Sequence, residues 1–236
     1  MRAIGIPSPG NRNRCLPSVV IFLIASLFAF LAVGCSASAP DFDEFKGTPF
    51  TGERPAPDFT LTDQFGKPRS LRTDFDDRVT LLTFLYTECP DVCPIVANHL
   101  RDISGILDDG EPDTAIVIVS VDPINDTVES AHAYSERWGM QDRWTYLVGN
   151  EEDLTEVWHA YFIDPYQHGP GNREDGGEAT HSRSQGGGTS GLERASRRVI
   201  HSAPIYVIDG DGIMRSAFTL PLAPEEVVHD VRLVGG

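Results

Sequence analysis

Two cysteines four positions apart, Cys89 and Cys93, are the residues of this chain most suited to chemistry. They lie in the segment TECPDVCP, which follows the apolar run Thr80–Tyr86. That run predicts a buried strand, and the residues from Cys93 onward predict a helix. Backbone N–H groups and the positive end of the helix dipole favour thiolates at such a turn. Sulfurs four positions apart on a first helical turn share one face, so a disulfide and a shared metal ion both fit.

The N-terminal 35 residues have the pattern of a secretory signal. Three arginines precede the uncharged apolar run Val19–Val33, and a Gly-Cys pair ending at Cys35 follows. This order resembles the bacterial lipobox and predicts lipidation of Cys35, with residues 1–35 as a signal peptide. The alternative is an uncleaved N-terminal membrane anchor, although about 15 apolar residues are few for a span. Both interpretations tether the domain to the extracytoplasmic face of the bacterial cell membrane.

These assignments leave Cys89 and Cys93 as the cysteines of the exported part, because Cys15 and Cys35 lie within the signal. An isolated pair in an oxidising compartment indicates a disulfide, a redox couple or a metal site. A disulfide across four residues closes too small a loop to restrict the unfolded chain much. A purely structural disulfide is therefore disfavoured.

The exported part is strongly acidic. The 19 basic residues minus the three signal arginines leave 16 against 35 acidic residues, a net charge of −19. This balance opposes nucleic-acid binding and adhesion to anionic lipid. About 200 residues suit one domain with a substantial core.

Predicted strands alternate with predicted helices along the chain. We expect a flexible spacer over residues 36–54 and one domain over residues 55–234. The glycine-rich segment 168–198 holds eight glycines and few apolar residues, which predicts a mobile, disordered insertion. The predicted strands are 59–62, 79–86, 115–121, 144–148, 204–209 and 213–219, and the predicted helices 70–75, 92–107, 126–138, 150–161 and 224–233. This order predicts an α/β fold with a mixed central sheet flanked by helices.

Three segments together resemble the Sco/SenC family. They are FLYTECPDVCP (84–94), VSVDP with the Asp-Thr pair after it (119–127), and His201-Ser followed by YVIDGDG (206–212). The resemblance extends from about Ala56 to Val234. It implies a thioredoxin-like fold and one copper ion bound through Cys89, Cys93 and His201. It also implies delivery of copper to, or reduction of thiols in, the copper-A centre of cytochrome c oxidase.

The chemistry of these three side chains agrees with that implication. Two thiolates and an imidazole are a soft ligand set suited to Cu(I), whereas structural zinc takes four ligands. Zinc with water as the fourth ligand fits the same residue types. We therefore expect a tethered copper-binding metallochaperone rather than an enzyme. Its partners would be the copper-A subunit of the oxidase or another copper chaperone.

Two other functions use the same cysteines. An extracytoplasmic thiol–disulfide oxidoreductase would use Cys89 to attack and Cys93 to resolve, without metal. A peroxidase of related fold is disfavoured, because the motif offers no cation to activate the thiolate. Copper binding needs both thiols reduced, so a Cys89–Cys93 disulfide would be the metal-free form.

Neighbouring residues receive structural roles. Asp122 is expected to form a turn and Asp126 to cap the following helix. The charge of Asp91 would raise the pKa of a nearby thiol, opposing the helix dipole, so the net effect stays open. Pro204 is expected at a strand entry; a cis peptide before it would instead favour thiol exchange.

Overall fold

The computed structural model describes residues 41–107, 112–165 and 203–235. Its strands are β1 (Thr48–Pro49), β2 (Thr60–Asp63), β3 (Pro68–Ser70), β4 (Val79–Leu85), β5 (Thr114–Ser120), β6 (Thr145–Val148), β7 (Ile205–Ile208) and β8 (Met214–Phe218). Its helices are the 3-10 turn η1 (Phe42–Glu44), α2 (Leu71–Asp74), α3 (Val92–Leu107), α4 (Val128–Trp138), α5 (Glu151–Ala160) and α6 (Pro224–Val234).

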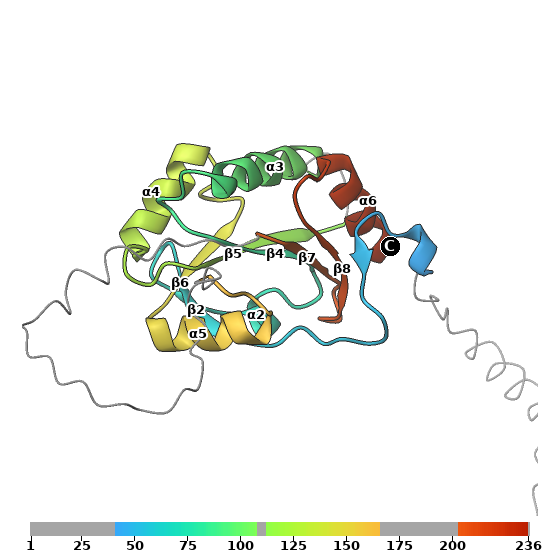
Figure 1. Cartoon of the computed structure of the whole chain (residues 1–236), viewed down its shortest axis with the longest axis horizontal. Coiled ribbons are helices and arrows are strands. Elements are labelled where there is room, and N and C mark those ends of the chain that lie inside the picture. Colours follow the sequence, from blue (N-terminus) through green and yellow to red (C-terminus); the bar gives the residue numbers. More distant parts are fainter. Residues whose placement is uncertain (1–40, 108–111, 166–202, 236) are drawn as a thin grey trace, which may run out of the picture. The chain divides into compact units, whose positions relative to one another are not determined.

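Within the described residues, the strands form one mixed sheet in the order β1-β8-β7-β4-β5-β6-β2-β3. Strands β4, β5 and β6 run parallel, while β7 pairs antiparallel with β4 on the other side. Helices α3, α4 and α6 cover one face of the sheet, and α2 and α5 cover the other (Figure 1). The predicted mixed sheet flanked by helices is therefore confirmed.

The central strand β4 is buried along its whole length, and its side chains alternate between the two faces. Leu81 and Leu85 join the apolar cluster under α3, α4 and α6, whereas Leu82 and Phe84 join the cluster over α5. This alternation is the period of two that strand geometry imposes. A strand buried on both faces reads as a continuous apolar run, which explains why the sequence pattern located it.

The folded region begins earlier than we expected. The predicted flexible spacer ended at residue 54, yet β1 pairs with β8, placing Thr48 opposite Ala217. The backbone N–H groups of Lys46 and Gly47 donate to the buried carboxylate of Asp230, at 2.8 and 3.1 Å. A two-residue strand has too little periodicity to predict, and its partner lies some 170 residues away in sequence.

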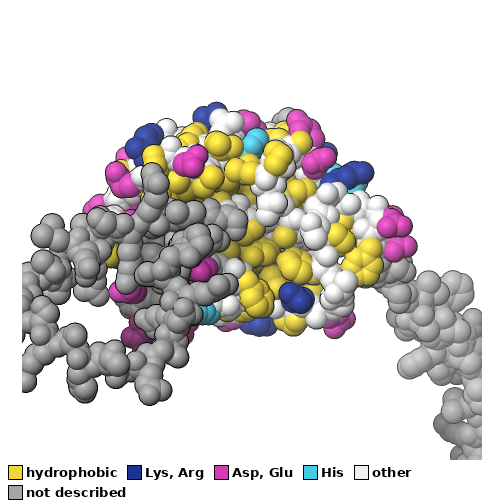
Figure 2. All heavy atoms as spheres, in the orientation of Figure 1, with side chains coloured by type: hydrophobic (Ala, Val, Ile, Leu, Met, Phe, Trp, Pro, Cys, Tyr) yellow, Lys and Arg dark blue, Asp and Glu magenta, His cyan; other side chains and the backbone are white. Residues whose placement is uncertain are grey.

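The predictions for residues 1–35, 36–40 and 168–198 lie outside the described residues. In the part of the chain that the structure describes, no helix combines the length and apolar character needed to cross a bilayer. Figure 2 shows Asp and Glu side chains mainly around the edge of the described surface, with hydrophobic side chains in the middle of this view.

Candidate metal centre

The cysteine pair lies at the junction between the end of β4 and the start of α3. Backbone N–H of Cys89 donates to the carbonyl of Tyr86 at 3.4 Å, which closes a tight turn after the strand. Helix α3 begins at Val92, so Cys89 precedes the helix and Cys93 lies in its first turn. Pro94 is tolerated there because first-turn N–H groups have no partner within the helix. The predicted strand-to-helix turn is confirmed.

Both cysteines are free thiols, and they touch. The backbone N–H of Cys93 donates to Sγ of Cys89 at 3.4 Å. Cys93 is fully buried, whereas Cys89 is partly exposed. The structure therefore has the reduced pair, and the disulfide stays a prediction for the oxidised protein.

The two thiols differ sharply in acidity. A hydrogen bond from the Cys93 thiol lowers the pKa of Cys89 to about 5, with help from backbone N–H groups of Asp91 and Cys93 and from the Tyr86 hydroxyl. The same contact with Cys89, together with burial, raises the pKa of Cys93 well above its ordinary value. Cys89 is thus the thiolate at neutral pH, and Cys93 keeps its proton.

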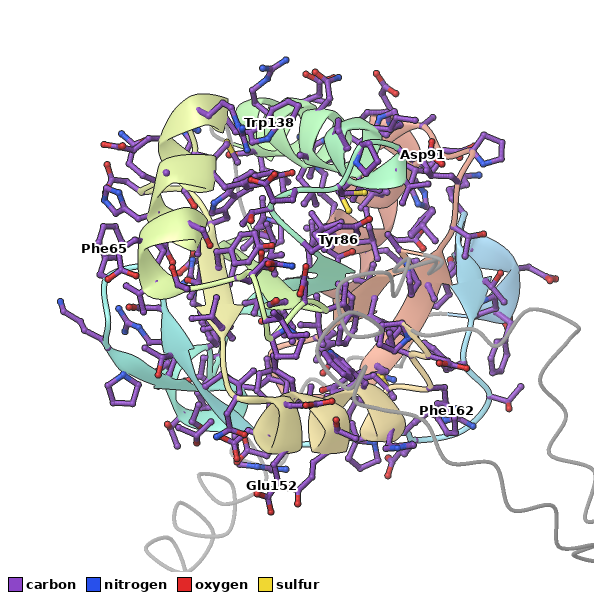
Figure 3. The ribbon with its side chains drawn as sticks, turned by 60° about the vertical axis from the view of Figure 1, so that its left-hand side comes forward. Phe65, Tyr86, Asp91, Trp138, Glu152 and Phe162 are labelled. Atoms are coloured by element: carbon purple, nitrogen blue, oxygen red, sulfur yellow. The ribbon has the colours of Figure 1, made fainter. Side chains whose placement is uncertain are left out.

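Tyr86 and Asp91 flank this pair, and Figure 3 shows sulfur atoms between the two labelled residues. Burial and the hydrogen bond to Cys89 raise the pKa of Tyr86, so its hydroxyl stays protonated. Asp91 acts on Cys89 through its backbone N–H, which lowers the pKa of the thiol. We expected the negative charge of Asp91 to raise the pKa of a nearby thiol, but the net effect of the surroundings is to lower the pKa of Cys89.

The loop after β5 lies beside the cysteine loop, because β4 and β5 are parallel and Leu85 is level with Ser120. Asp122 forms the predicted turn: its Oδ1 accepts from the backbone N–H groups of Ile124 and Asn125, at 3.3 and 3.2 Å.

The prediction for Asp126 was wrong. Thr127 caps α4 by accepting from the N–H of Ser130, while the Asp126 carboxylate points inward and accepts from Thr87. Burial raises the pKa of Asp126, although hydrogen bonds from Ser120 and Thr87 oppose the rise. Sequence reasoning missed this residue because Asp and Thr are both good N-caps.

The third predicted ligand, His201, lies outside the described residues, as does the lipidation site Cys35. Within the described residues, no group of three or more His, Cys, Asp or Glu side chains is arranged to hold a metal ion. Pro204 immediately precedes β7, as expected for a strand entry. The cis peptide bond of the described residues is Leu220–Pro221, so Ala203–Pro204 is trans.

Residues 49–234 match the family model described as SCO1/SenC. The chain belongs to the SCO1/SenC family. The bovine mitochondrial protein SCO2 homolog is 27% identical over 177 residues, which cover 74% of this chain and 58% of the bovine protein. This chain thus spans under two thirds of that relative's length.

Solved structures of SCO1/SenC proteins share the fold. A SCO1/SenC family lipoprotein from Bacillus anthracis superposes with a TM-score of 0.61 at 21% identity, over 81% of this chain and 99% of that one. ScoI of Bradyrhizobium japonicum, solved with copper bound, gives a TM-score of 0.53 at 26% identity, over 76% and 98%. The predicted thioredoxin-like α/β fold and the family assignment are both confirmed.

Proposed function

We propose that this protein binds one Cu(I) ion through Cys89, Cys93 and His201, and serves cytochrome c oxidase assembly by delivering copper to the copper-A site or maintaining its thiols. The observation that carries the proposal is the pair of touching free thiols at the start of α3, one of them already ionised at neutral pH. Thiolates are the ligands that Cu(I) prefers. The copper in the Bradyrhizobium relative supports the choice of metal.

The antiparallel pairing of β4 with β7 supports His201 as the third ligand. Leu82 pairs with Tyr206 and Thr80 with Ile208, so the beginning of β7 lies toward the end of β4 that leads to Cys89. Ala203, two residues from His201, belongs to the same buried cluster as Cys93. Two residues of extended chain span at most about 7 Å. The length of chain between Ala203 and His201 therefore allows the imidazole to reach the cysteine pair.

Anaerobic Cu(I) titration in competition with a chromophoric chelator tests this assignment. We expect one tightly bound Cu(I) per reduced chain, lost in Cys89→Ser and Cys93→Ser and strongly weakened in His201→Ala. His159→Ala, a change at an exposed histidine of α5, is the matched control and should bind like the wild type. Full copper affinity in His201→Ala would remove His201 from the site.

One observation favours a second function, thiol–disulfide exchange. An ionised, partly exposed Cys89 beside a protonated, buried Cys93 is the arrangement of an attacking and a resolving thiol. In this case the metal-free protein would reduce protein disulfides catalytically, and His201→Ala would retain that activity. Absence of turnover with a disulfide substrate would leave the copper role alone.

The membrane tether belongs to the same proposal. Lipidation at Cys35 would hold the domain at the extracytoplasmic face of the membrane, close to a membrane-embedded oxidase. Labelled fatty acid should enter the wild-type chain and Cys15→Ala but not Cys35→Ala. Labelling of Cys35→Ala would show that the lipidation site is elsewhere.

A further inference from the structure

Asp126 is a buried carboxylate whose two oxygens are both occupied by donors from other segments. Its Oδ1 accepts the backbone N–H of Thr87 at 3.1 Å and the Thr87 hydroxyl at 2.7 Å. Its Oδ2 accepts the hydroxyls of Ser120 at 2.6 Å and Tyr146 at 3.2 Å. The residue is 4% exposed, so these donors replace the water that the carboxylate has lost.

These contacts fasten the cysteine loop to the neighbouring strands. Thr87 stands two residues before Cys89, while Ser120 ends β5 and Tyr146 lies in β6. A second contact holds the other backbone group of the same residue: Nη2 of Arg137, in α4, donates to the carbonyl of Thr87 at 3.4 Å. The backbone N–H and carbonyl of Thr87 are thus both anchored from the segment that carries Asp126 and α4.

We propose that Asp126 is a positioning residue that fixes the loop of Cys89 so that its sulfur meets Cys93 and the metal. This inference rests on the proposed copper function. A loop that is already ordered loses little conformational freedom when the metal binds, whereas a loose loop must be ordered at the expense of affinity. Groups that orient metal ligands commonly contribute 10- to 100-fold in affinity.

The chain offers variants that separate positioning from general stability. Asp126→Ala removes the acceptors of all four hydrogen bonds. Asp126→Asn keeps an oxygen for the two Thr87 donors, and its amide can donate to the hydroxyls of Ser120 and Tyr146. The asparagine should therefore rescue what the alanine loses.

Asp209→Ala is the matched control. Asp209 is also a buried carboxylate, 6% exposed, and accepts from the N–H groups of Asp211 and Ile213 and from Arg215. It follows β7 at the end that pairs with the beginning of β4, since Ile208 is level with Thr80. Its loss should lower stability without touching the cysteine loop.

The test is the anaerobic Cu(I) competition titration on the full chain. We expect Asp126→Ala to bind copper about 10- to 100-fold more weakly than the wild type, and Asp126→Asn to recover most of that loss. Asp209→Ala should keep wild-type affinity despite a lower melting temperature. Wild-type affinity in folded Asp126→Ala, or an equal loss in Asp209→Ala, would overturn the inference.

Hydrogen exchange of the reduced, metal-free protein gives a readout that needs no copper. The Thr87 amide should exchange faster in Asp126→Ala than in the wild type or Asp126→Asn; equal protection would refute the anchoring. If Asp126→Ala does not fold, Thr87→Val takes its place, because it removes the hydroxyl that donates to Asp126 at 2.7 Å. Thr87→Ser restores that hydroxyl and is the rescue variant. A wild-type chain without Cys-dependent copper binding would refute the proposed function, while the exchange result would still decide the anchoring.

Discussion

Replacing Cys93 by alanine should shift the pH at which Cys89 becomes reactive. The Cys93 thiol is the largest cause of the lowered pKa of Cys89, which is about 5 in the reduced, metal-free protein. A free cysteine titrates near 8.5. Without the S–H donor, the pKa of Cys89 should rise by roughly 1 to 3 pH units, since the backbone N–H donors remain.

Two opposing effects set the change in rate, whose upper limit is the change to a free cysteine. At pH 6 a thiol with pKa about 5 is ~90% ionised, whereas one with pKa about 8.5 is ~0.3% ionised, a ratio of about 300. A thiolate of lower pKa is also a weaker nucleophile, by roughly 25- to 60-fold over this interval. The net advantage of the low-pKa thiol at pH 6 is therefore about 5- to 12-fold, and above about pH 7 it becomes the slower one.

The assay is alkylation by iodoacetamide under reducing, metal-free conditions, followed by mass spectrometry that localises the label to Cys89. The rate profile of the wild type should have its midpoint near pH 5, and that of Cys93→Ala should lie higher and cross it. Cys93→Ser keeps an O–H donor at the same position, so its midpoint should rise less.

The crossing of the two rate profiles distinguishes a change in the pKa of Cys89 from a change in its exposure to the reagent. Removing a buried side chain could expose Cys89 and raise its rate at every pH, which would displace the profile without moving its midpoint. A wild-type midpoint near 8.5, or equal midpoints in the wild type and Cys93→Ala, would refute the assignment of the thiolate to Cys89 through Cys93.

Three further outcomes follow from single sites. The unfolding free energy of the reduced wild type should fall relative to that of Cys89→Ser as the pH drops from about 8.5 to 5. The reason is that a thiol whose pKa is lowered by folding stabilises the fold only while it is ionised. Urea titrations that give the same pH dependence for both proteins would contradict this. Asp230→Ala should cost about 2–4 kcal/mol in urea unfolding, because Asp230 accepts two backbone N–H groups and the Ser216 hydroxyl; a loss below 1 kcal/mol, on the order of one exposed hydrogen bond, would show that water replaces it. Gly139→Ala should cost about 1 kcal/mol, because the glycine ends α4 at φ +67°; an unchanged melting temperature would count against that strain.

The larger elements of the fold could be predicted from sequence because each carries its own local signal. Helix α3 has the predicted bounds, Val92–Leu107, and Gly139 ends α4 in the left-handed conformation that glycine adopts most easily. The short strands β1 and β3 escaped prediction, because two or three residues carry no periodicity and their pairing depends on distant partners. Elements long enough to show a periodic pattern could therefore be predicted, and the shortest strands could not.

The closeness of the two cysteines could be predicted from the sequence, but the difference between them could not. The four-residue spacing predicted that Cys89 and Cys93 lie close together. Only the structure shows that Cys93 is buried and protonated, whereas Cys89 is partly exposed and ionised. The role of Asp126 was hidden for a similar reason. A capping residue and an inward-facing anchor look alike until the partners, Thr87 and Ser120, are known.

The unequal acidity of the two thiols bears on how a copper ion would be held under the proposed function. Cys89 can form the first bond without losing a proton, whereas a bond to Cys93 requires its proton to leave, because metal ligands must be deprotonated. Binding through Cys93 would therefore release a proton, so copper affinity would depend on pH. The same difference in acidity would serve the second proposed function, thiol exchange, since attack needs an ionised thiol and resolution a second thiol beside it.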